Sequence, residues 1–190
     1  MRKTYILGLM ALGAMTFAAN ADIIPTLSSI APSAGLFQWN YASNVTVDQN
    51  VTSGDFFTIY DFAGFIPGSA TAPAGWTFTS SLTGVTPGKV SPTDNPAIPN
   101  LTWTYTGATI PGSAALGTFS VLSATNLLRT ADFAAQGTRN SGPDIGTKVN
   151  NVGTVSVPIP EMSALAPMIG VCGLGMIGFA TSILRRRQAR

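Results

Sequence analysis

The sequence predicts a mostly β protein, in which a single β-sandwich-like domain is followed by one C-terminal transmembrane helix. Two observations predict this arrangement. Between residues 22 and 157, short runs rich in β-branched and aromatic residues are separated by turn-forming segments. After them, residues 164–184 form a charge-free stretch of the length that crosses a bilayer.

Residues 1–21 have the organisation of a secretory signal peptide. Arg2 and Lys3 form a basic start, an apolar segment follows, and the three residues ANA that end at Ala21 place small side chains where cleavage is determined. We therefore expect cleavage between Ala21 and Asp22, and export of the chain that follows. The alternative, an uncleaved membrane anchor, is disfavoured because the apolar run is short and ends in a cleavage site.

The clearest strand signal is the segment LTWTYTG at residues 101–107. Leu101, Trp103 and Tyr105 alternate with threonines, which is the period-two pattern of a strand with one buried face. Similar runs occupy residues 44–51, 55–62, 75–81, 116–123 and 151–157. Residues 126–136 are ambiguous, and we interpret them as a loop that leads into a strand. Many short strands at turn-separated intervals favour a sandwich.

The C-terminal stretch from Ala164 to Leu184 contains 21 residues without a charge. A helix of that length spans roughly 30 Å, the hydrocarbon thickness of a bilayer. A basic cluster at residues 185–190 begins with Arg185, Arg186 and Arg187. Because positive charge stays on the cytoplasmic side, we expect the C-terminus inside the cell and the β domain outside.

A short motif precedes this stretch. Val157-Pro158-Ile159-Pro160-Glu161, the charge-free span and the arginines together resemble the PEP-CTERM sorting signal of Gram-negative bacteria, which is the recognition tail of exosortase substrates. The usual motif is Pro-Glu-Pro, whereas here Ile159 stands between the prolines and Glu161, the only glutamate in the chain, follows them.

The resemblance covers about 30 residues and implies a division into a signal peptide (1–21), an exported domain (22–157) and a sorting tail (158–190). It implies an exosortase-type membrane protease as partner and an inner-membrane intermediate held by residues 164–184. It further implies delivery to the cell envelope or the extracellular surface. We expect the two prolines to keep the motif extended and open to the protease.

Composition argues against an enzyme. The chain has no histidine, and its single cysteine, Cys172, lies in the predicted span, so neither a Ser-His-Asp triad nor a zinc site can be assembled. Asp55 and Asp61 flank one predicted strand and are the candidate carboxylate pair for glycoside hydrolysis, although nothing else in the sequence marks them. We expect no catalytic residues, no metal and no cofactor. Five aspartates are candidate calcium ligands, but no recognisable calcium-loop motif contains them: Asp48, Asp55, Asp61, Asp94 and Asp144.

The basic residues do not indicate nucleic-acid binding. Between Asp22 and Val157 there are four basic residues and seven aspartates, which gives that part a net charge of −3. Two functions remain: a structural protein of the envelope or extracellular matrix, or a polysaccharide-binding module. The second would use aromatic side chains to stack on sugar rings, although alternation favours their burial. These aromatics are Trp39, Trp76, Trp103, Tyr41, Tyr60 and Tyr105.

Overall fold

The structure is a computed structural model that describes residues 23–160. The expected signal peptide, the charge-free stretch and the basic cluster lie outside these residues. The described part is built of strands and turns, which confirms that this part of the chain is mostly β. Its strands are β1 (Ile23–Ser33), β2 (Leu36–Val45), β3 (Gln49–Asn50), β4 (Phe56–Ile59), β5 (Trp76–Ser81), β6 (Asn100–Tyr105), β7 (Ala114–Ser123), β8 (Leu128–Arg139) and β9 (Lys148–Pro158). Between residues 23 and 160 no helix has the length and apolarity needed to cross a membrane.

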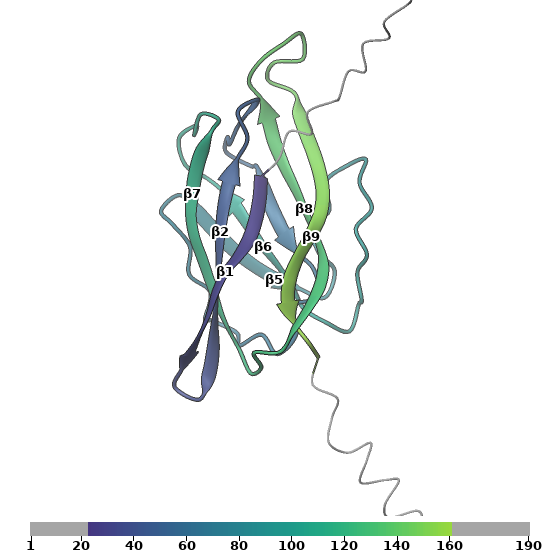
Figure 1. Ribbon diagram of the computed structural model, residues 1–190. Coiled ribbons are helices and arrows are strands. Elements are labelled where there is room, and N and C mark those ends of the chain that lie inside the picture. Colours follow the sequence, from purple (N-terminus) through teal and green to yellow (C-terminus); the bar gives the residue numbers. More distant parts are fainter. Residues whose placement is uncertain (1–22, 161–190) are drawn as a thin grey trace, which may run out of the picture.

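The strands form two antiparallel sheets (Figure 1). One sheet has the order β1-β2-β7. The other has six strands, in which β3, β8, β4, β6 and β5 follow one another and β9 pairs with β8. Residues 133–136 of β8 pair with β4 and with β9 at once, so β8 is an interior strand. The chain enters the fold at Ile23 and leaves it after β9 at the opposite end of the molecule (Figure 1).

Aromatic side chains from both sheets join the two layers. Phe57 of β4 is fully buried and stacks on Trp103 of β6, with ring centroids 5.1 Å apart. From the other sheet, Phe119 of β7 meets the Phe57 ring edge-on, at 4.9 Å between centroids and an interplanar angle of 90°. Such aromatic pairs add to the free energy gained by burying the rings. The core therefore lies between the facing sheets and is centred on Phe57.

Most of the expected strands are present, with three differences. The run 44–51 is not one strand, because Val45 ends β2 and the chain turns before β3 begins at Gln49. The ambiguous segment 126–136 contains most of β8, which begins at Leu128 and continues to Arg139. The hairpin of β1 and β2 was not predicted. Its turn, Ala34-Gly35, has φ values of 49° and 81°, the conformation that matches the twist of a tight hairpin.

Truncating the Phe57 side chain should lower the free energy of unfolding more than truncating any exposed side chain. In residues 22–160, we expect Phe57→Ala to lower the free energy of unfolding by about 3–5 kcal/mol, because the cavity would remove contacts with both sheets. Val152→Ala on β9, at a position 47% exposed, should cost less than about 1 kcal/mol. Urea denaturation measures both. Equal losses for the two variants would contradict a core centred on Phe57.

Candidate functional site

The candidate site is the place where the C-terminal tail leaves the fold. Of the predicted sorting motif, Pro158, Ile159 and Pro160 are described by the structure. Pro158 is the last residue of β9, is buried and pairs with Leu128 of β8. Ile159 is 38% exposed, yet its backbone N–H donates a hydrogen bond of 2.9 Å to the carbonyl of Leu127. The domain thus extends past the expected boundary at Val157.

The remaining predicted site residues fall outside the described range. These are Ala21 and Asp22 of the signal-peptide cleavage site, Glu161 of the motif, and Arg185, Arg186 and Arg187 of the basic cluster. The first described residue, Ile23, is fully buried at the start of β1. The first strand that the structure describes therefore begins two residues after Ala21.

Pro158 differs from the expectation that both prolines keep the motif open. Within a strand, successive N–H groups point to opposite sides, and that of Ile159 points to β8. The nitrogen of Pro158 therefore faces away from β8, toward the open edge of the sheet. An edge strand tolerates proline at such a position, because no ladder hydrogen bond is lost. The first half of the motif consequently belongs to the domain.

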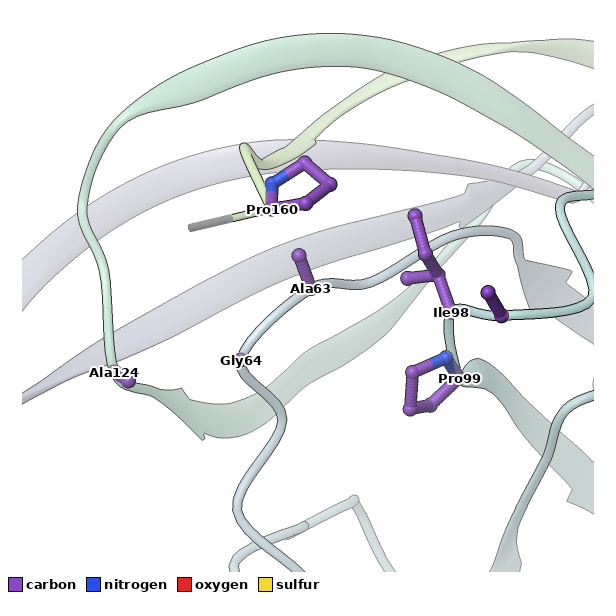
Figure 2. A pocket seen from close by; sticks show the side chains of 7 residues that line it. Ala63, Gly64, Ile98, Pro99, Ala124 and Pro160 are labelled. Carbon is purple, nitrogen blue, oxygen red and sulfur yellow. The ribbon is translucent and has the colours of Figure 1, made fainter. Parts of the chain in front are cut away.

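Pro160 lies at an apolar hollow of about 250 Å³ (Figure 2). The hollow is lined by small or apolar residues from three segments: Ala63 and Gly64, Ala97 to Pro99, and Ala124, together with Pro160. Gly64 has a φ of 62°, and a Cβ there would lie 2.9 Å from the hydroxyl of Ser123. Any larger residue at position 64 would disturb this wall. Pro160 therefore forms part of the lining of this hollow.

A polar network fixes the walls of the hollow. Asp61 accepts a hydrogen bond from the backbone N–H of Asn95 at 2.8 Å, and its own N–H donates to the side-chain carbonyl of Asn100 at 2.7 Å. Its carboxylate lies 3.4 Å from the guanidinium of Arg129 on β8. Asn100 also donates to the carboxylate of Asp94 at 2.9 Å. These contacts hold the segments after β4 and before β6 against the start of β8.

Two core aromatics fasten the same end of the domain. Trp39 donates its ring N–H to the carbonyl of Thr125, at 3.0 Å. Tyr41 donates its hydroxyl to the carbonyl of Ser156 on β9, at 2.9 Å, and so joins the two sheets two residues before Pro158. Burial raises the pKa of Tyr41 well above its ordinary value. The hydroxyl therefore stays protonated and remains a donor.

Asp55 and Asp61 do not form a catalytic pair. They lie beyond opposite ends of β4, and an extended chain of six residues places them roughly 15–20 Å apart. That separation exceeds the range in which two carboxylates act on one glycosidic bond. Asp55 is fully buried, where it accepts hydrogen bonds from Thr52, Thr138 and Lys148, the last at 2.6 Å. Its charge ties β8 and β9 to the loop before β4.

The other candidate ligands are likewise dispersed. Within residues 23–160, no group of three or more His, Cys, Asp or Glu side chains gathers as a metal site. Asp48 and Asp144 act through their backbone carbonyls, which accept hydrogen bonds from Asn140 and Thr147. The six aromatic residues considered for sugar stacking are all buried, with exposed fractions of 9% or less. The described surface therefore offers no stacking platform built from these six.

The comparisons with known proteins give no further guide. No protein-family model, no curated protein sequence and no solved structure matches this chain.

Replacing Tyr41 with phenylalanine should alter both stability and its dependence on alkaline pH. At neutral pH we expect a loss of about 1 kcal/mol, because the carbonyl of Ser156 loses its donor. The pKa of Tyr41 is raised in the fold, so the stability it contributes is complete below about pH 10 and falls as pH rises further. Tyr41→Phe should therefore flatten this decline, as followed by urea denaturation between pH 7 and 11.

Tyr60 provides the comparison for this measurement. Burial also raises the pKa of Tyr60, whose hydroxyl bonds to Val85 and Thr86 and not to β9. Tyr60→Phe should flatten the alkaline decline in the same way, and the double variant should flatten it further. An unchanged decline in Tyr41→Phe would rule out the buried phenol as its source.

Proposed function

We propose that the chain is an exported structural protein of the envelope or extracellular matrix of a Gram-negative bacterium. A β-sandwich-like extracytoplasmic domain would first be held by one transmembrane helix at residues 164–184. An exosortase-type protease would then sort the protein and cut it at its C-terminal tail. The observation that carries the proposal is the order of the tail: a proline-containing motif with one glutamate, a charge-free stretch and an arginine cluster.

The extent of the fold is compatible with both expected cuts. Cleavage between Ala21 and Asp22 leaves one residue before β1, which begins at Ile23. At the other end, Pro158 pairs with β8 and Ile159 is hydrogen bonded to Leu127. A cut before Ile159 would divide this paired end, whereas a cut at or after Pro160–Glu161 would leave the domain whole. We therefore propose release on the C-terminal side of Pro160.

The structural role is preferred to polysaccharide binding on the placement of aromatic side chains. Trp39 and Trp103 are fully buried, and Trp76 packs against Phe119 from the other sheet. Sugar recognition by stacking needs ring faces open to solvent. An aromatic core packed between the sheets, together with the proposed processing of the tail, fits a structural protein better than a polysaccharide-binding module.

Replacing the two residues at the proposed cut with alanine should block release. In the full chain, Pro160→Ala with Glu161→Ala should leave membrane insertion intact and leave the domain joined to its tail. The protease would lose both the extended shape and the charge that distinguish this tail from other single spans. Mass spectrometry of the exported protein should find an N-terminus at Asp22, and a truncated C-terminus in the native chain only.

An exposed proline–carboxylate pair elsewhere in the chain supplies a matched control. Pro143→Ala with Asp144→Ala makes the same chemical change in the loop between β8 and β9 and should not affect release. If the native domain were recovered still joined to residues 164–184, and Pro160→Ala with Glu161→Ala behaved identically, the tail would be a permanent anchor.

The arginine cluster should set the orientation of the chain. Replacing Arg185, Arg186 and Arg187 with glutamates should impair retention of the C-terminus in the cytoplasm, because the positive charge that opposes its translocation is lost. Protease protection of a C-terminal tag in intact spheroplasts measures the orientation. Arginine-to-lysine replacements preserve the charge and should behave like the native chain. Unchanged orientation in the glutamate variant would exclude the cluster as the determinant.

A further inference from the structure

Three large apolar side chains are exposed where the tail leaves the domain. Leu127 is 61% exposed, Leu128 is 53% exposed and Ile159 is 38% exposed. The three residues adjoin one another along the backbone at one end of the β8–β9 pair, because Ile159 donates its N–H to the carbonyl of Leu127 and Leu128 pairs with Pro158. We name them the exit rim. Such a cluster costs free energy in water, since each side chain would gain by leaving it.

The length of the tail fixes what the exit rim faces. Ala164, the first residue of the charge-free stretch, comes only four positions after Pro160, with three residues between them. Fully extended, these four steps span at most about 14 Å. The headgroup region on each side of a bilayer is roughly 5–8 Å thick. If residues 164–184 span the membrane, as the proposed function requires, the exit end of the domain must lie at or just above the lipid surface.

We propose that the exit rim inserts into the boundary between lipid headgroups and acyl chains, and seats the uncut domain on the bilayer. The partner is the lipid surface itself, and the inference rests on the proposed transmembrane tail. Apolar side chains at such a boundary bind by burying their area, as amphipathic surface elements do. Seating holds Pro160 and Glu161 at a fixed height above the membrane, where a membrane-embedded protease works. Once the tail is cut, three side chains alone give only reversible contact.

The experiment measures membrane depth at the exit rim in the full chain. Cys172→Ser removes the native thiol, and Leu127→Cys introduces one that is labelled with the environment-sensitive fluorophore NBD. The chain is reconstituted in vesicles of phosphatidylethanolamine and phosphatidylglycerol. We expect the emission to shift to shorter wavelength and to be quenched by lipids that carry a nitroxide on the acyl chain. Adding Leu128→Asp should reverse both effects, because the charge opposes insertion.

The matched control places the same label at the other end of the same two strands. Ile145, in the loop between β8 and β9, is 65% exposed and is about as apolar as Leu127. Ile145→Cys should show emission typical of water and no quenching by the nitroxide lipids. Equal spectra and equal quenching at positions 127 and 145, in chains that float with the vesicles, would overturn the seating and leave the transmembrane tail intact. Failure of the chain to float with the vesicles would overturn both.

Other occupants of the exit rim give different results. A shift to shorter wavelength that grows with protein concentration in detergent, without quenching by nitroxide lipids, would assign the rim to contacts between copies of this chain. A shift that appears only when the protease is co-reconstituted would assign it to that protein. Either result overturns insertion into lipid.

Discussion

The pairing of β8 with β9 is the interaction on which the rest of the structure depends. Its register runs without interruption from Leu128 opposite Pro158 to Thr138 opposite Lys148. The other edge of β8 is bonded to β4 and β3, so β8 connects the aromatic core to the last strand of the chain. Lys148 and Asp55 fasten one end of this pair, and Tyr41 fastens the other. The position at which the tail leaves the fold is therefore set by a rigid ladder.

The sequence predicted those strands in which large apolar and polar residues alternate. In LTWTYT, the alternation of large apolar residues with threonines is complete, and β6 is found there. Two other strands lack such a pattern for physical reasons. The hairpin of β1 and β2 contains Pro25 and Pro32, and its register shifts between Leu27 and Ser29. In β8 the buried positions include small alanines, so no alternation of large apolar and polar side chains marks the strand.

The sequence located the segment where the tail leaves the domain, but it did not predict how Pro158 and Ile159 are bound there. Prolines 158 and 160 predicted an extended segment, and the tail motif predicted a sorting function, which stays a prediction. That Pro158 ends a strand depends on Leu128, and the bond of Ile159 depends on Leu127, both about thirty positions earlier in the chain. Asp55 and Asp61 illustrate the same limit. The sequence places them at the two ends of one predicted strand, whereas their hydrogen-bond partners come from distant segments and separate them into two networks.

β9 is the last strand of the described domain, and this position determines when during export the domain can finish folding. If the chain is exported from its N-terminus as proposed, β8 crosses the membrane before β9 and remains open along one edge until residues 148–158 have crossed. The sheet is complete only once Pro158 has emerged, and by then residue 164 is a few positions behind. If residues 164–184 enter the bilayer as proposed, completion of the domain coincides with their arrival there. A copy that reaches the proposed protease would, by this order of events, already have had the opportunity to fold.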